Sequence, residues 1–143
     1  MQQQITLPNA GASYDWANDH IYIKAPSAYT AGRVTLVEDT LKPGFHLARH
    51  YHKTMTEIFY ILEGEVVFVF DDERVVATPG ATLTIPPHIW HDVSCVQGGK
   101  LLTLFSPGGF EQYMAALAAL SPTQLDDATR LQTLAEKYDT WTA

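Results

Sequence analysis

The stretch HYHKTMTEIFYILEG, residues 50–64, determines how the whole sequence is interpreted. It places His50 and His52 one residue apart, follows them with Glu57, and ends on Gly64 after an apolar run. Successive side chains of a β-strand point to opposite faces, so the two imidazoles point the same way, with Cβ atoms about 7 Å apart. Two imidazoles in this arrangement can bind one ion. The polar segment KTMT has the length of a turn, so the Glu57 carboxylate can reach the same place from a neighbouring strand.

Short β-branched and aromatic runs surround this stretch from Arg33 to about Phe105. The runs are RVTLVEDT, HLARHYH, EIFYILE, EVVFVFD, RVVATP, ATLTIP, WHDVSCV and KLLTLFS. Turn-forming pairs such as Pro79-Gly80 and Gly98-Gly99 separate them at intervals typical of an antiparallel sandwich or barrel. About eight strands with tight turns predict an all-β jelly roll.

The amino-acid composition changes after Gly109, where the sequence becomes rich in Ala and Leu at helical spacing. Ser121-Pro122-Thr123-Gln124 has a capping serine, a proline at the first helical position and a glutamine three residues after the cap. A helix is expected to begin there, with an apolar stripe formed by Leu125, Ala128, Leu131, Leu134 and Tyr138. The chain is thus divided into an N-terminal arm (1–32), a barrel (33–109) and a C-terminal helical extension (110–143) packed on the barrel.

A further metal-ligand candidate, His91, opens a strand after the turn at Pro86-Pro87. A lone His-x-His pair in a β-rich chain is more often exposed or hydrogen-bonded than metal-binding. Here, however, five of the six histidines lie between His46 and His91. A buried Glu57 would also be costly without a cation or hydrogen-bond partners. The constellation therefore favours a metal site.

The motifs resemble those of the cupin superfamily. The first cupin motif is matched in spacing by Gly44, His50, His52, Glu57 and Gly64, and the second by Gly80, Pro86 and His91. His88 stands where a glycine is usual, and Cys95 where an asparagine is usual. The segments AGRVTLVED and SPGGFEQY further resemble small single-domain quercetinase-like cupins, so that the likeness covers about residues 33–113. It implies a double-stranded β-helix cupin barrel with C-terminal α-helices and a metal held by His50, His52, Glu57 and His91.

Three neutral imidazoles and one carboxylate suit one divalent transition metal per chain. Fe, Mn, Ni, Co, Cu and Zn all accept such ligands, whereas Mg²⁺ and Ca²⁺ prefer more oxygen. Four protein ligands leave one or two positions of a larger coordination shell for water, substrate or dioxygen. The resemblance to quercetinase-like cupins implies that Glu57 is also the catalytic base, which takes a proton from a substrate hydroxyl.

Strand alternation predicts the walls of a substrate pocket beside these ligands. The expected wall residues are Phe59, His46, Val93 and Cys95. The last two share a face with His91, and counting alternate residues back from His50 through Ala48 leads to His46. Such walls are mostly apolar and suit a flat, weakly polar organic molecule. Phe59 is equally well explained as core, and His46 as an exposed histidine at a strand edge.

Composition argues against several classes of partner. The chain of 143 residues has a formal net charge of −7, and its nine Lys and Arg are scattered singly. No basic patch follows from this pattern, so nucleic acid and anionic membranes are poor candidates. The start lacks the pattern of a secretory signal, and no apolar run approaches the roughly 20 residues of a membrane span. A cytoplasmic protein is expected, and its single cysteine fits a reducing compartment.

The leading hypothesis is a metal-dependent enzyme acting on a small aromatic or enol-bearing molecule, a quercetinase-like dioxygenase that also uses dioxygen. The alternatives are a non-oxidative lyase, isomerase or cyclase, and a non-catalytic module that binds a small ligand or a metal. The edges of an open barrel predict a homodimer. The N-terminal arm, with Tyr14, Trp16 and Tyr22, is expected to be either a lid or a strand exchanged with a partner.

Overall fold

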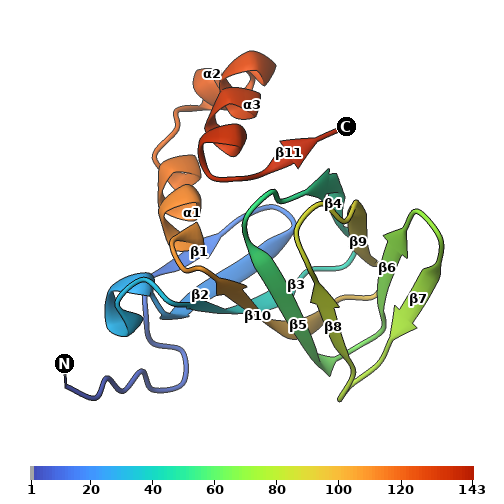
Figure 1. Cartoon of the computed structure of the whole chain (residues 1–143), viewed down its shortest axis with the longest axis horizontal. Helices are drawn as coiled ribbons and strands as arrows, with labels where there is room; N and C mark the ends of the chain where they lie inside the picture. Colours follow the sequence, from blue (N-terminus) through green and yellow to red (C-terminus); the bar gives the residue numbers. More distant parts are fainter. Residues whose placement is uncertain (1) are drawn as a thin grey trace.

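The computed structural model describes residues 2–143 and consists of two antiparallel sheets with helices near the C-terminus (Figure 1). The first sheet has the order β1 (Ser13–Asp15), β2 (Asp19–Ala25), β3 (Thr35–Leu41), β10 (Gly99–Ser106), β5 (Thr56–Glu63) and β8 (Thr82–Ile85). The second has the order β11 (Trp141–Thr142), β4 (Phe45–Tyr51), β9 (His91–Cys95), β6 (Val66–Phe70) and β7 (Arg74–Ala77). A short 3₁₀ helix, Ser27–Thr30, connects β2 to β3.

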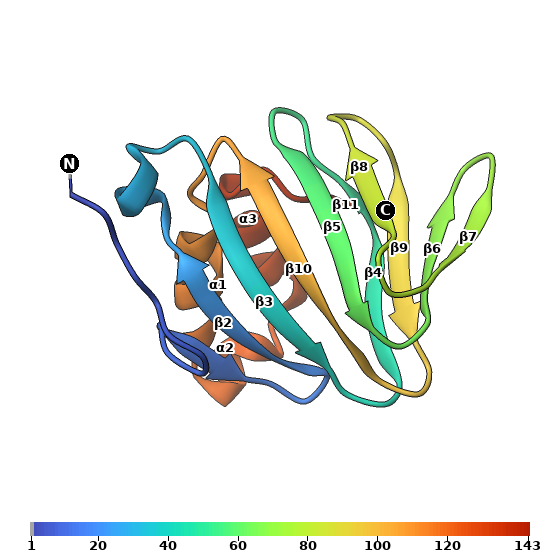
Figure 2. The same ribbon diagram turned by 90° about the horizontal axis from the view of Figure 1, so that it is seen from below.

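Strands β3 to β10 form a jelly roll, as the sequence predicts. They pair as four nested antiparallel hairpins, β3 with β10, β4 with β9, β5 with β8, and β6 with β7. Alternate hairpins fall in alternate sheets, so the nested ribbon is rolled into a double layer. Each of the eight strands coincides with one of the eight predicted β runs and extends beyond it by at most one residue. Figure 2 shows β2, β3, β10 and β5 side by side, with the C-terminal helices behind them.

The core lies between the two sheets, where alternate residues point inward. Along β9 the pattern is strict: His91, Val93 and Cys95 are buried, and the two residues between them are half-buried. Phe59 of β5 meets Phe68 of β6 across this interior, with ring centroids 5.0 Å apart. Each such side chain contributes about 1.5–3 kcal/mol on burial. The rigid interior fixes the inward-facing ends of β4, β5 and β9, which carry the polar residues described below.

The N-terminal arm belongs to the first sheet. Strand β2 pairs with β3 of the same chain, and β1 pairs with β2. Tyr14 and Trp16 stack with ring centroids 5.5 Å apart and pack against a second apolar cluster that includes Met114. The division at residues 32 and 109 stays a prediction.

Three helices follow the last barrel strand: α1 (Phe110–Ala118), α2 (Pro122–Leu125) and α3 (Ala128–Lys137). The capping box at Ser121 is confirmed, because Ser121 Oγ accepts the Gln124 N–H and Gln124 Oε1 accepts the Ser121 N–H. A single helix running on from there is wrong, since α2 ends at Leu125 and Asp127 caps α3 by accepting the Arg130 N–H. Within residues 2–143, no helix is both long and apolar enough to cross a membrane.

Candidate metal centre

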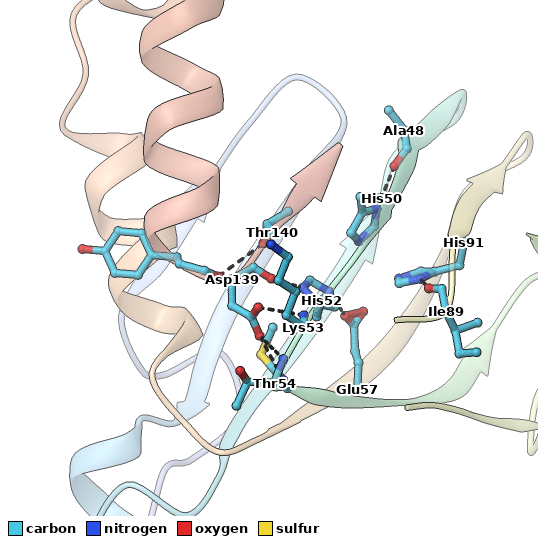
Figure 3. Close-up of polar contacts among 12 residues, drawn as sticks. Ala48, His50, His52, Lys53, Thr54, Glu57, Ile89, His91, Asp139 and Thr140 are labelled. Atoms are coloured by element: carbon cyan, nitrogen blue, oxygen red, sulfur yellow. Dashed lines mark hydrogen bonds and ion pairs between the residues drawn. The ribbon is translucent and has the colours of Figure 1, made fainter. Parts of the chain in front are cut away.

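Four buried side chains from three strand ends converge on one point (Figure 3). His50 of β4 lies opposite His91 of β9 in the strand register, His52 follows directly after β4, and Glu57 is the second residue of β5. One ligand-type atom from each of the four lies within 4.8 Å of all the others. His50 is the most exposed of the four, at only 5%. The structure thus brings together all the ligands that the sequence proposes.

Backbone carbonyls orient all three imidazoles in the same way. His50 Nδ1 donates to the Ala48 carbonyl at 2.7 Å, and His91 Nδ1 donates to the Ile89 carbonyl at 2.9 Å. His52 Nδ1 donates to the Asp139 carbonyl at 2.7 Å. A carbonyl only accepts, so each ring carries its proton on Nδ1 and turns Nε2 toward the cluster. This N–H to carbonyl contact is the usual arrangement for histidines that ligate metals.

The atoms that face the cluster lack sufficient partners of their own. His91 Nε2 is buried and has no hydrogen-bond partner among residues 2–143. His52 Nε2 lies 3.1 Å from Glu57 Oε2, and the rings of His50 and His91 are 4.2 Å apart between centroids. Three imidazole nitrogens and one carboxylate oxygen, packed this closely and shielded from water, suit a single divalent transition-metal ion.

Burial and mutual contacts set the protonation of the cluster. Burial lowers the pKa of His50 to about 4, with a further contribution from the nearby His91. Burial also lowers the pKa of His91. Burial alone would raise the pKa of Glu57, but the hydrogen bond from His52 and the surrounding imidazoles lower it instead. His50 and His91 are therefore neutral and Glu57 is ionised near neutral pH, as metal ligation requires. Burial opposes the protonation of His52, but the hydrogen bond to Glu57 and the charge of Glu57 raise its pKa, so a bound metal would displace the proton from His52 Nε2.

A cavity of about 340 Å³ lies next to the cluster, and His50 and Glu57 form part of its wall. Of the predicted pocket residues, Phe59 and Val93 line it, and both are buried. Cys95 does not line this cavity; its Sγ donates to the Glu65 carbonyl at 3.3 Å.

His46 borders the cavity but is exposed to solvent. Counting alternate residues back from His50 is wrong here, because the pairing of β4 with β9 shifts by one residue between Leu47 and His50. Such a bulge reverses the alternation, so the register pairs Leu47 with Val93. Leu47 is itself exposed, and it lines the cavity together with His46.

Two aspartates also line the cavity, and the sequence did not single them out. Asp19 of β2 and Asp39 of β3 are half-buried, and Asp39 Oδ1 is a buried atom without a donor among residues 2–143. Burial, together with the hydrogen bond to Asp19 and its charge, raises the pKa of Asp39 to about 9. Asp39 therefore keeps its proton at neutral pH and shares it with Asp19. The sequence did contain one signal for Asp39: it alternates with Val37 and Leu41, which point inward, so Asp39 is expected to point inward too.

The fold and the cluster agree with a match to a protein-family model described as a cupin domain, which covers residues 37–106. Residues 37–106 form a cupin domain. The matched segment contains all four residues of the cluster.

Curated relatives of this cupin include an enzyme. The quercetin 2,3-dioxygenase of Bacillus subtilis (strain 168) is 29% identical over 96 residues, which are 66% of this cupin and 28% of the relative. An uncharacterized protein of Methanocaldococcus jannaschii is 34% identical over 68 residues, which are 48% of this cupin and 54% of the relative. This cupin thus covers less than two thirds of the length of either relative.

Solved structures with the same fold include other small cupins. An RmlC-like cupin from Shewanella frigidimarina superposes with a TM-score of 0.68 at 21% identity, covering 78% of this chain and 96% of the other. KdgF from Halomonas sp. also gives a TM-score of 0.68, at 18% identity, covering 76% of this chain and 99% of the other. At these identities the likeness shows the fold alone.

Proposed function

We propose that this cupin is a metal-dependent enzyme acting on a small aromatic or enol-bearing molecule, and that it is a dioxygenase of the quercetin 2,3-dioxygenase type. The observation that carries the proposal is a buried three-histidine, one-glutamate cluster that opens into a mostly apolar cavity through His50 and Glu57. The similarity to the dioxygenase of Bacillus subtilis over 96 residues supports the choice of reaction.

His50, His52, Glu57 and His91 would hold one ion of Fe, Mn, Ni, Co, Cu or Zn. A bound ion of this kind supplies a Lewis acid and open coordination positions for a substrate oxygen and, if it is redox-active, for dioxygen. The cavity supplies the rest of the binding site. Its volume of about 340 Å³ lies at the lower end of the range for small-molecule sites.

Aromatic side chains make the cavity suitable for a flat ring. Those along its wall are Trp16, Phe45, Phe59, Phe105, Phe110 and Tyr113. Phe105 and Phe110 stack with ring centroids 4.4 Å apart, which gives this part of the wall a fixed shape. A planar aromatic or enol-bearing substrate would bury its apolar faces here while its hydroxyl reaches the cluster.

Glu57 is the proposed base. It lines the cavity, and the neighbouring imidazoles keep its pKa low, so its carboxylate is ionised and free to accept a proton. A substrate hydroxyl that approaches the cluster would lose its proton to Glu57. The hydrogen bond from His52 holds Oε2 in place, which leaves Oε1 as the oxygen better able to accept this proton.

A non-oxidative reaction is the second candidate, because the same donor set also suits Zn²⁺. The chain would then be a lyase, isomerase or cyclase in which the ion polarises a carbonyl. A third outcome is a cupin that binds a metal or small ligand without catalysis. Pairing into a homodimer stays a prediction, which the molar mass from light scattering would test.

The first experiment is metal analysis by mass spectrometry on protein purified without chelator or metal resin. The double variant His50→Ala/His52→Ala should lose the metal, whereas His20→Ala, on the opposite face of β2 from the cavity, should retain it. Near-stoichiometric Fe, Mn, Ni, Co or Cu, followed by oxygen uptake with flavonols, catechols or diketones, would support the dioxygenase. Zinc alone, with turnover unchanged under anaerobic conditions, would favour the non-oxidative reaction. Absence of metal after reconstitution would contradict both.

A further inference from the structure

The three histidines of the cluster differ in where their orienting carbonyls come from. His50 and His91 donate to residues two positions earlier in the chain, so their own strands fix their rings. His52 donates to the carbonyl of Asp139, which is 87 residues away. Residues near His52 in sequence therefore do not determine its ring orientation, and a segment outside the matched cupin domain does.

Asp139 also binds the loop that connects two members of the cluster. Its carboxylate accepts the backbone N–H groups of Lys53 at 2.7 Å, Thr54 at 2.9 Å and Met55 at 2.9 Å. These three residues lie between His52 and Glu57 in the sequence. Figure 3 shows the Asp139 carboxylate beside Lys53 and Thr54. One residue therefore contacts His52 through its carbonyl and the following turn through its side chain.

The end of α3 presents Asp139 in the necessary conformation. Asp139 has φ of 59°, in the left-handed region, and the Thr140 N–H after it returns to the Ala135 carbonyl at 2.9 Å. This arrangement terminates a helix and turns the chain sharply. The residues that follow form β11, where Trp141 pairs with Tyr51 and Thr142 with His50. The C-terminal segment is thus fixed by the end of α3 before Asp139 and by the ligand-bearing strand β4 after it.

We infer that the C-terminal segment 139–142 completes the metal centre, with Asp139 as the positioning residue for His52. The Asp139 carbonyl keeps the His52 proton on Nδ1 and leaves Nε2 to the ion, and the Asp139 carboxylate fixes the turn that sets the spacing between His52 and Glu57. Outer contacts of this kind change metal affinity by about 10–100-fold when they are lost. The inference rests on the proposed metal binding by the cluster, and does not depend on which reaction follows.

The test is titration of the full-length, metal-free protein with Co²⁺ alone, followed by its visible absorption bands, which report the coordination geometry. Asp139→Ala should weaken Co²⁺ binding by about 10–100-fold and alter the bands. Both variants keep the main-chain carbonyl, but Asp139→Asn also keeps one side-chain acceptor oxygen and a tolerance for left-handed φ, so a smaller loss is expected. Asp127→Ala is the matched control, because it removes another carboxylate that accepts a backbone N–H at the opposite end of α3.

The outcomes separate a positioning role from a structural one. If Asp139→Ala and Asp127→Ala lower the thermal midpoint alike but only the first changes Co²⁺ affinity and spectrum, the inference is supported. Wild-type affinity and spectrum in folded Asp139→Ala would overturn it. If Asp139→Ala does not fold, Asp139→Asn decides by the same criteria. A wild-type protein that binds no Co²⁺ would overturn the metal-dependent function as well, whereas unchanged affinity in the variants overturns this inference alone.

Discussion

Glu57 and Asp39 line the same cavity, yet their carboxyl groups differ in protonation. Burial by itself raises the pKa of both. Around Glu57, the hydrogen bond from His52 and the nearby imidazoles more than offset burial, so the pKa is lowered and the group is ionised. Beside Asp39 the main neighbour is a second carboxyl, Asp19, which adds to the effect of burial and brings the pKa to about 9.

The comparison teaches that the partners of a buried carboxyl, more than its depth, decide whether it is charged. On β10, Glu57 pairs with Phe105 and Asp39 pairs with Leu101, so the two lie about 13 Å apart along the strand direction. One part of the cavity therefore presents an anion among nitrogen ligands, and the other presents a proton shared between two acids. Only the first is suited to bind a metal cation.

Exchanging each acid for its amide gives the largest contrast. Glu57→Gln keeps the shape but removes the charge and the better ligand, so metal affinity should fall by about 100-fold or more and turnover should be lost. Asp39→Asn should leave metal affinity within about twofold, because the acid that it replaces is already neutral. Titration of both metal-free variants with Co²⁺ measures this. Equal losses in the two variants would mean that the two ends of the cavity do not differ as described.

Metal removal should lower the stability of the wild type much more than that of Glu57→Gln. An ion that binds the folded chain at 100 times its dissociation constant adds about 2.7 kcal/mol to the free energy of unfolding. Chelation should therefore shift the urea midpoint of the wild type downward, and should shift that of Glu57→Gln much less. Comparable shifts in both proteins would show that the chelator acts elsewhere than at this cluster.

The metal cluster could be predicted from the sequence because its residues carry rare side chains at fixed spacing in two local motifs. His50, His52 and Glu57 lie within eight residues, and strand geometry alone orients the two histidines alike. The jelly roll followed from regular turns between β runs for the same reason: the information is local.

Other features depend on contacts between distant segments, and these were not visible in the sequence. The bulge in β4, which places Leu47 opposite Val93, arises from the pairing with β9. The break between α2 and α3 depends on Asp127 capping a new helix within an apolar pattern that suggested one helix. The contacts of Asp139 with His52 link residues 87 positions apart. Asp39 had a local signal, because it occupies an inward-facing position of β3. An acid at such a position indicates a shared proton only when Asp19 is known to lie beside it.

The proton on Asp39 should make stability fall as pH rises. Its pKa is about 9 in the folded chain against 3.8 as the ordinary value, so between these limits the folded state binds a proton that the unfolded state lacks. Unfolding then releases this proton and becomes easier at higher pH. One proton corresponds to at most ~1.4 kcal/mol per pH unit, and we expect the Asp39 proton to contribute a loss of about 2 kcal/mol between pH 6 and 8, against which the lowered pKa values of His50 and His91 act in the opposite direction. Asp39→Asn should remove this contribution, which urea unfolding of both proteins at several pH values measures as the difference between their slopes; equal slopes would place the proton elsewhere.

Asp71 extends the comparison to a carboxyl in water. It forms an ion pair with Arg49 at 2.5 Å, but the two side chains are 63% and 43% exposed, so solvent screens their attraction. Arg49 also has a second partner, because its guanidinium lies 4.5 Å from the centre of the Trp90 ring. Asp71→Asn should therefore change the free energy of unfolding by less than about 0.5 kcal/mol, with no change in its pH slope or in metal affinity. A larger loss in urea unfolding would show that exposure does not limit the contribution of this pair to the free energy of unfolding. The partners of a carboxyl group would then matter at the surface as much as they do for Glu57 and Asp39 in the interior.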